Sequence, residues 1–229
     1  MNPKLNPGTI ETYFNDYSIV EYLKKNLNAF SGNVIDIGCG KMKHKNLILS
    51  NKNVKKYTGL DLDEGKFEYK SKADIYWDGI KIPLNDNSVD GAILFEVIEH
   101  CPDPSIVIKE AFRILKSGSS ILFSTPFLYH FHGLPHDYSR PTPSLLKQLF
   151  LNAGFSSVNI ESGGKWDASL GQMIAIWITQ RPMPKLFRKI LRRIHVLVFK
   201  FLLFNDKRNK NLTLDNGTIV PNLLGRAIK

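Results

Sequence analysis

The segment VIDIGCG at residues 34–40 constrains the fold more than any other part of the chain. Its apolar residues form a short run, a pattern typical of a strand that is buried on both faces of a sheet. Gly38 and Gly40 then allow the backbone to turn sharply and a ligand to approach it closely. The segment therefore predicts a buried strand that ends in a tight, ligand-facing turn.

Apolar runs and helical repeats alternate along the chain. Strands are predicted at residues 33–37, 57–61, 73–76, 89–95, 120–125, 157–161 and 223–228. Helices are predicted at residues 17–28, 104–115 and 142–153, with Asp16 as an N-cap, Pro143 in a first helical position and Gly154 as a stop signal. Such alternation implies parallel pairing through right-handed crossovers. We therefore expect a doubly wound α/β sheet with its ligand beyond the carboxyl ends of the strands.

The spacing of one acidic residue indicates the kind of ligand. Asp61 follows Gly40 by 21 residues and ends the second predicted strand, where a carboxylate can accept hydrogen bonds from both hydroxyls of a ribose. These features fit a dinucleotide or an adenosyl ligand. The third glycine of a dinucleotide fingerprint would fall at Lys43, however, and a pyrophosphate site needs that glycine. This disfavours the dinucleotide.

With these motifs in order, the sequence resembles the class I S-adenosylmethionine-dependent methyltransferases, in particular the small type 11 group. The resemblance covers roughly residues 15–161 and the last few residues. It rests on six segments in the family's order: VIDIGCG, TGLD, ADIYWDGIKIPLNDNSVD, AILFEVIEHCPDP, KSGSSILFSTP and DYSRPTPSLLKQLFLNAGF. The resemblance implies a Rossmann-like, mostly parallel sheet of seven strands with an antiparallel last strand.

The resemblance also implies a set of S-adenosyl-L-methionine contacts. The turn at Gly38, Cys39 and Gly40 would lie under the methionyl part, with Asp36 near its amino group. Asp61 would bind the ribose, Asp74 and Ile75 the adenine, and Glu96 would lie near the methionyl or methyl-transfer end. Met42 stands where the third family glycine is expected, so loop 41–46 is predicted to be bulkier or differently routed.

A histidine-rich segment follows the fifth predicted strand, at the ligand edge of the sheet. A hydroxyl acceptor must lose a proton, and histidine is the usual base near neutral pH. One hypothesis is that this loop lines the acceptor pocket; the alternative is a structural loop in which Arg140 pairs internally. The candidate bases are His132 and His136, with His100 as a further candidate, and the candidate substrate contacts are Asp137, Tyr138 and Arg140. A metal site is disfavoured, because a loop rich in Pro and Gly fixes no ligand geometry.

The net charge of +10 is concentrated in one segment. Residues 181–210 contain ten Lys or Arg and a single acid, Asp206, so the rest of the chain is close to neutral. Helices are predicted at residues 168–179 and 185–204, and the second is amphipathic and basic. Its apolar side either packs on the domain, with the basic side solvated, or lies in an anionic membrane surface. Lys200 and the arginine cluster forbid a membrane span.

The organisation expected from these patterns is a single methyltransferase domain. It comprises an N-terminal helical segment (1–32), a cofactor-binding core (33–161), a basic helical insertion (165–215) and a last strand (216–229). Two cysteines, Cys39 and Cys101, cannot build a disulfide framework. The first residues carry no secretory signal, so a cytoplasmic location is expected, with a possible peripheral position on the inner face of the membrane.

The sequence thus predicts methyl transfer from S-adenosyl-L-methionine to a small-molecule, glycan or lipid-linked acceptor, as in polysaccharide biosynthesis. Two alternatives remain open: a nicotinamide-dependent oxidoreductase, and a degenerate methyltransferase-like protein that only binds. Met42 in the cofactor loop keeps the second alternative open. A nucleic acid acceptor is disfavoured, because the basic charge is not spread over a face of the body.

Overall fold

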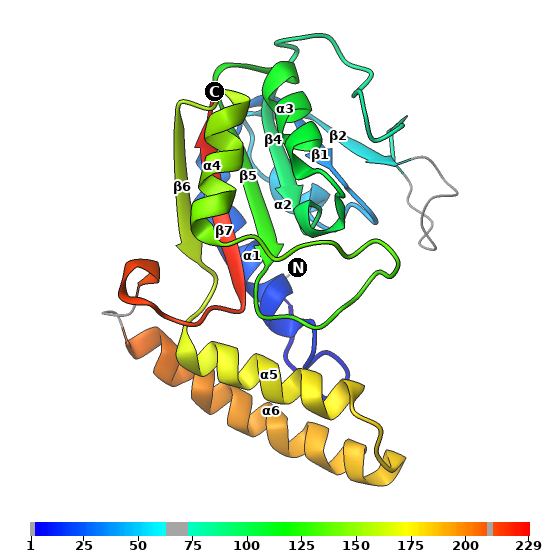
Figure 1. Ribbon diagram of the computed structural model, residues 1–229, viewed down its shortest axis with the longest axis vertical. Coiled ribbons are helices and arrows are strands. Elements are labelled where there is room, and N and C mark those ends of the chain that lie inside the picture. Colours follow the sequence, from blue (N-terminus) through cyan, green and yellow to red (C-terminus); the bar gives the residue numbers. More distant parts are fainter. Residues whose placement is uncertain (1–2, 63–72, 210–212) are drawn as a thin grey trace. The chain divides into compact units, whose positions relative to one another are not determined.

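A computed structural model describes residues 3–62, 73–209 and 213–229, and its central element is a sheet of seven strands (Figure 1). The strand order is β3-β2-β1-β4-β5-β7-β6. The bounds are β1 Gly32–Ile37, β2 Val54–Leu62, β3 Ile75–Trp77, β4 Val89–Phe95, β5 Leu115–Pro126, β6 Ser157–Ser162 and β7 Asn222–Ile228. All the strands predicted from the sequence are present, with ends that differ by a few residues.

The sheet is parallel except at its last strand. β1 pairs in parallel with β2 and β4, and the pairs β2–β3 and β4–β5 are also parallel. β7 runs the other way beside β5: Lys229 pairs with Gly118 and Ser119 at one end, and Pro221 pairs with Phe127 at the other. The prediction of a mostly parallel sheet with an antiparallel last strand is therefore confirmed.

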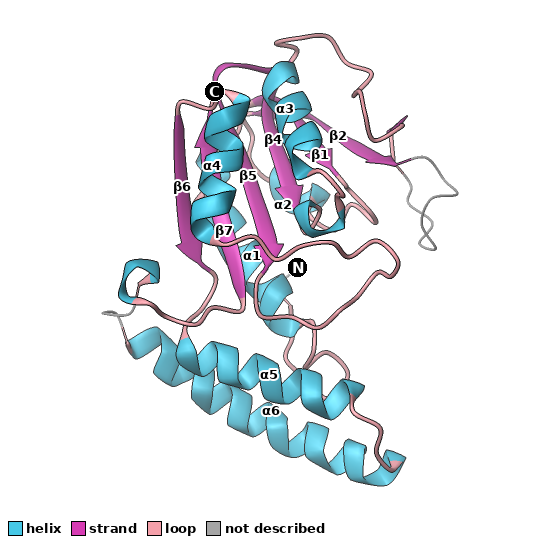
Figure 2. Cartoon of the chain, in the orientation of Figure 1, coloured by secondary structure: helices cyan, strands magenta, loops and turns pink. Residues whose placement is uncertain are grey.

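Helices cover both faces of the sheet: Figure 1 shows α3 and α4 side by side on one face and α2 on the other. Figure 2 colours the helices cyan and the strands magenta in the same view. The α-helices are α1 Tyr13–Lys25, α2 Lys45–Leu49, α3 Pro104–Ile114, α4 Pro143–Ala153, α5 Trp166–Gln180 and α6 Lys185–Arg208, and the 3₁₀ helices are η1 Leu27–Ala29, η2 Ile98–His100 and η3 Leu214–Asn216.

Local capping chemistry explains where α4 begins and ends. The Thr142 side chain accepts a hydrogen bond from Leu145 N, Pro143 occupies the first turn, and Gly154 ends the helix in a left-handed conformation with φ 109°. The expectation for Asp16 is wrong, because α1 begins at Tyr13 and Asp16 lies within its first turn. α2 was not expected from the sequence.

The chain divides into two compact units, which we describe separately. The core unit comprises Leu23–Thr125, Gly133–Ile160 and Leu224–Lys229, and it contains most of the sheet. The hairpin unit comprises Met1–Tyr22, Pro126–His132 and Glu161–Leu223, and α5 and α6 are its main helices. The described residues contain no helix long and apolar enough to cross a membrane.

Candidate active site

The turn after β1 is built by two glycines with positive φ. Gly38 has φ 74° and Gly40 has φ 49°, in the left-handed region that favours glycine. The N–H groups of Gly38 and Cys39 both donate to Leu60 O of β2, at 2.8 and 3.0 Å. A Cβ at Gly38 would lie 2.3 Å from Val97 Cγ2. The turn is therefore held tightly between the carboxyl ends of β1, β2 and β4.

The far side of this turn is open. A Cβ at Gly40 would meet no heavy atom of the described residues within 4 Å. The adjacent side chain, Cys39, is buried, and burial raises the pKa of its thiol to about 12. Cys39 therefore stays protonated near neutral pH and behaves as a small apolar group.

Asp61 ties this turn to β2. Its Oδ2 accepts a hydrogen bond from Gly40 N at 2.8 Å, and its Oδ1 accepts one from Leu62 N at 2.9 Å. The side chain is buried close to the carboxyl end of β2. A carboxylate has two acceptor oxygens with about four lone-pair sites, which suits it to the two hydroxyls of a ribose.

A second buried carboxyl group lies beneath the turn. Asp36 of β1 accepts a hydrogen bond from the hydroxyl of Tyr57 in β2. Burial raises the pKa of Asp36 to about 7, against the lowering effect of that hydrogen bond, and the nearby Asp61 adds to the rise. Asp36 therefore changes charge in the physiological range. Tyr57 was not singled out from the sequence, because its contact with Asp36 depends on the register of β1 against β2.

Met42 adopts the left-handed backbone conformation that favours glycine. Its φ is 51°, and Met42 N donates to Cys39 O at 2.7 Å. Its Cε lies 2.6 Å from the point where a Cβ on Gly59 would be. The bulk of the loop is thus accommodated against β2, because residue 59 has no side chain.

The acid predicted to contact adenine lies at the amino end of β3. Asp74 precedes β3 directly, and its Oδ2 accepts from Gly59 N at 2.8 Å. Ile75, its predicted partner, is the first residue of β3 and pairs with Leu60. Asp78 instead follows the carboxyl end of β3, the edge where a doubly wound sheet binds its ligand. Sequence reasoning passed over Asp78 because the short strand was placed at residues 73–76.

Glu96 follows β4 in a left-handed backbone conformation, with φ 55°. Ser124 of β5 fixes it there: Glu96 N donates to Ser124 O at 3.2 Å, and Ser124 Oγ donates to Glu96 Oε1 at 2.8 Å. A positive φ in a residue other than glycine costs free energy, and such residues often lie at functional sites.

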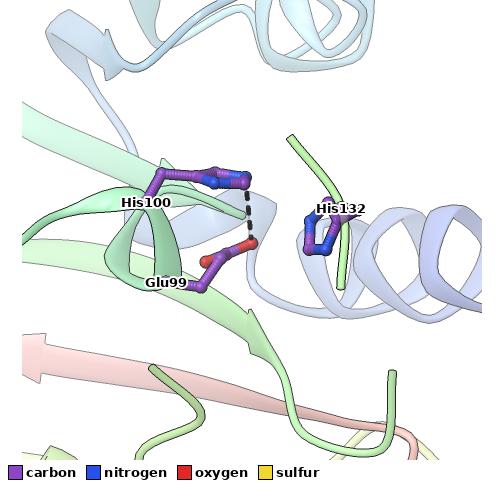
Figure 3. Close-up of side chains that lie close together, drawn as sticks. All are labelled: Glu99, His100 and His132. Atoms are coloured by element: carbon purple, nitrogen blue, oxygen red, sulfur yellow. Dashed lines mark ion pairs between the residues drawn. The ribbon is translucent and has the colours of Figure 1, made fainter. Parts of the chain in front are cut away.

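Glu99 and His100 form a pair just beyond Glu96, in η2. The side chain of Glu99 is fully buried, and His100 Nε2 lies 3.8 Å from Glu99 Oε1 (Figure 3). Burial, together with the negative charge of Glu96, raises the pKa of Glu99 well above its usual range. Nδ1 of His100 lies 2.5 Å from His136 O, and only a protonated nitrogen bonds a carbonyl. Nε2 is therefore the nitrogen of a neutral His100 that can accept a proton.

The histidine-rich loop is anchored on this pair. Tyr138 N donates to Glu99 O at 2.8 Å, and His136 Nδ1 lies 3.2 Å from the hydroxyl of Tyr138. A Cβ at Gly133 would lie 3.0 Å from His100 Cε1. Residues 133–138 thus lie against η2, at the carboxyl end of β4.

Arg140 makes an internal ion pair. Its Nη1 lies 2.5 Å from Asp137 Oδ1, and its Nη2 lies 2.9 Å from Asp137 Oδ2, which is a bidentate arrangement. This contact is the one expected if the loop is structural. A role for Arg140 in binding an anionic acceptor stays a prediction.

His132 belongs to the other unit. Its Nδ1 lies 3.3 Å from His130 O, and its ring packs edge-on against Tyr129. The neighbouring His130 is paired with Glu11, with Nε2 and Oε1 2.8 Å apart. The core unit therefore brings His100 and His136 together, whereas His132 lies within the hairpin unit.

These residues form a site suited to an adenosyl sulfonium. The glycine turn offers an open backbone surface, Asp61 offers acceptors for a diol, and Asp36 can supply a negative charge for an ammonium group. All three lie at the carboxyl ends of parallel strands. The residues present therefore fit S-adenosylmethionine.

Comparisons with known proteins agree with this geometry. A family model described as a methyltransferase domain matches residues 35–123. A relative from Mycolicibacterium smegmatis named "Probable S-adenosylmethionine-dependent methyltransferase" is 32% identical over 127 residues, which cover 52% of this chain and 48% of that protein. A ubiquinone biosynthesis O-methyltransferase from Pseudomonas fluorescens is 28% identical over 119 residues, 46% of this chain and 49% of that protein. The chain thus spans about half the length of these curated relatives.

Solved structures share the fold over nearly the whole chain. An S-adenosylmethionine-dependent methyltransferase from Archaeoglobus fulgidus has a TM-score of 0.57 at 18% identity and covers 92% of this chain and 93% of its own. The [4+2]-cyclase SpnF has a TM-score of 0.55 at 14% identity, with coverage of 92% and 80%. At these identities the likeness shows the fold alone.

The matched model, the motifs and the sheet together define a class I methyltransferase fold. Residues 35–123 match a methyltransferase domain, and the chain is similar there to S-adenosylmethionine-dependent methyltransferases, whose cofactor is S-adenosylmethionine. The comparisons support the family predicted from the sequence motifs.

Proposed function

We propose that this protein transfers a methyl group from S-adenosylmethionine to a small-molecule acceptor. The observation that carries this proposal is the buried Asp61 carboxylate, which is hydrogen-bonded to the open glycine turn at Gly40. The cofactor supplies an activated methyl group on a sulfonium, so the protein has mainly to bind, to orient and to exclude water.

Each part of the proposed cofactor has a candidate partner. The turn 38–40 supports the methionyl group, Asp36 faces its ammonium, and Asp61 accepts from the ribose hydroxyls. We place Asp78 at the adenine rather than Asp74, since it follows the carboxyl end of β3. Glu96, held by Ser124, lies at the methyl-transfer end.

The side chains around η2 favour an oxygen acceptor. An acceptor hydroxyl must lose a proton, and His100 Nε2 can take it; the Glu99 carboxyl group, 3.8 Å away, stabilises the resulting imidazolium when it is ionised. The relative named as an O-methyltransferase is in keeping with this chemistry. His132 and His136 remain candidate bases, and Asp137, Tyr138 and Arg140 candidate acceptor contacts.

We propose that the acceptor is a small molecule, a glycan or a lipid-linked precursor, such as those of polysaccharide biosynthesis. We also propose that the protein works peripherally at a membrane surface. The support for the membrane is the basic segment at residues 181–210.

The affinity for S-adenosylhomocysteine is expected to rise with pH. Asp36 holds a proton below its pKa of about 7, and the ligand's ammonium favours the ionised form. The dissociation constant should therefore fall by up to about tenfold between pH 6 and pH 8. Calorimetry at several pH values measures this change; a flat profile for the wild type, or an unchanged slope in Asp36→Asn, would contradict the role of Asp36.

Transfer itself is tested with S-adenosylmethionine carrying a labelled methyl group. The full-length protein is incubated with water-soluble and lipid extracts of the cells that make it, and the label is followed by chromatography. We expect label in a small-molecule or lipid-linked product with the wild type, and none with Asp61→Ala. Binding of NADH in place of S-adenosylhomocysteine would favour an oxidoreductase, and binding of neither would favour the degenerate protein.

A further inference from the structure

Helices α5 and α6 form a hairpin whose fold is fixed by its buried side. Phe199 of α6 packs directly on Gly171 of α5, where a Cβ would lie 2.3 Å from Phe199 Cδ2. The same small core contains Phe14, Ala168 and Ala175. The core therefore determines which side of α6 is turned inward.

Asp206 fixes the far end of the hairpin. Its Oδ1 accepts hydrogen bonds from the N–H groups of Lys165 and Ala168, both at 3.1 Å, at the start of α5. His195 of α6 is buried, and its ring stacks on that of Phe199. The inner side of α6 is thus set by His195, Phe199, Leu202 and Asp206.

The long apolar stripe of α6 consequently faces solvent. The exposed fraction is 71% for Leu186, 69% for Leu197 and 63% for Phe201. These residues recur every three or four positions, which places them along one side of the helix. We call this set the α6 stripe; its members are Leu186, Ile190, Ile194, Leu197, Phe201 and Phe204.

Helix α5 has a matching exposed stripe. Trp166, Leu170, Met173 and Trp177 are all about half exposed and recur at intervals of three or four residues. Scattered exposed apolar residues are common on soluble proteins, but continuous apolar stripes of this size mark a docking surface.

Positive charge runs beside the α6 stripe. Lys185, Lys189, Arg193 and Lys200 are exposed at helical spacing next to it. At the ends of the hairpin, cations lie over aromatic rings: Arg181 lies 5.0 Å from the Trp177 ring and Arg208 lies 5.3 Å from the Phe204 ring. The single acid of this segment, Asp206, is buried. The surface therefore offers apolar and cationic groups together.

We propose that the α5–α6 hairpin docks on an anionic lipid bilayer, with the α6 stripe in the acyl boundary and its basic residues at the headgroups. An amphipathic helix with exposed Leu, Ile and Phe beside Lys and Arg is the kind of element that binds this interface. Charge complementarity selects the occupant: a second copy of the hairpin would bring like charges together, whereas an anionic bilayer neutralises them. This inference deepens the membrane proposal but does not depend on methyl transfer.

The test is sedimentation of the full-length protein with vesicles of phosphatidylcholine alone and with vesicles that also contain phosphatidylglycerol. We expect binding to the anionic vesicles, which weakens as salt rises. The double variant Leu197→Glu, Phe201→Glu should lower the partition coefficient by a factor of ten or more, because the bilayer then no longer buries two large apolar side chains. The variant Lys189→Gln, Arg193→Gln should lower it about 30-fold at low salt.

The control is Leu145→Glu, which changes an exposed leucine on α4 (49% exposed, against 69% for Leu197) and should bind as the wild type does. S-adenosylhomocysteine affinity and circular dichroism, measured for each variant, show that the fold is retained and separate this inference from the proposed catalysis. No binding of the wild type to anionic vesicles at low salt would overturn the proposal. A dimer that dissociates in the Leu197→Glu, Phe201→Glu variant would also overturn it, since a second copy would then cover the stripe.

Discussion

Replacing Asp61 with alanine is expected to weaken S-adenosylhomocysteine binding by about 100-fold or more. A hydrogen bond to a charged group contributes about 1.5–3 kcal/mol, and a ribose offers two hydroxyls to this carboxylate. The substitution also removes the acceptor for Gly40 N, which loosens the turn under the methionyl group. Titration calorimetry measures the loss directly, and Asp61→Asn, which keeps one acceptor oxygen, should show an intermediate affinity.

Asp90 provides the matched control for Asp61. It lies at the amino end of β4, and its Oδ2 likewise accepts from a backbone N–H, that of Asn33, at 2.8 Å. Asp90→Ala should lower the melting temperature, because it also removes an ion pair with Lys116. It should leave the ligand affinity within about threefold, since the site lies at the opposite ends of the strands. Equal loss of binding in both variants would mean that Asp61 acts only through the fold.

Replacing His100 with alanine is expected to lower kcat for an oxygen acceptor by a factor of about 10² to 10⁴, the usual contribution of a positioned base. The affinity for S-adenosylhomocysteine should change little, because His100 is assigned to the acceptor. Single-turnover kinetics with the labelled cofactor separates these quantities. Glu99→Gln should retain part of the rate, because the amide keeps the shape of the side chain beside His100 Nε2 but removes the carboxyl group.

His136 is the comparison residue for this experiment. Its backbone carbonyl, not its ring, orients His100. His136→Ala should therefore keep the orientation of His100 and lose much less activity than His100→Ala. A larger loss of activity in His136→Ala, or full activity in His100→Ala, would contradict the assignment of His100 as the base and favour a residue of the histidine-rich loop.

The sequence predicted β4 and the limits of α4 well, because residues within or next to these elements determine where they begin and end. β4 was expected at residues 89–95 and lies there, since a continuous apolar run preceded by turn residues leaves little choice of ends. The limits of α4 follow from Pro143 and Gly154, whose backbone preferences act within one turn. Asp61 lies beside the glycine turn, near the carboxyl end of β2.

Other features depend on contacts between distant segments. The buried side of α6 is chosen by Phe199 against Gly171, which no periodicity in α6 reveals. Asp74 and Asp78 flank opposite ends of β3, a strand of three residues whose register is set by β2. Glu99 lies in the motif segment AILFEVIEHCPDP, but its burial and its pairing with His100 depend on the distant loop that packs against η2.

The most direct test of the central claim is a crystal structure of the protein with S-adenosylhomocysteine. The ribose hydroxyls should lie within hydrogen-bond distance of both oxygens of Asp61, with the amino-acid part on Gly38–Gly40 and the adenine beyond β3. Ligand density elsewhere, or a turn filled by the Met42 side chain at saturating ligand, would contradict the assignment of this site.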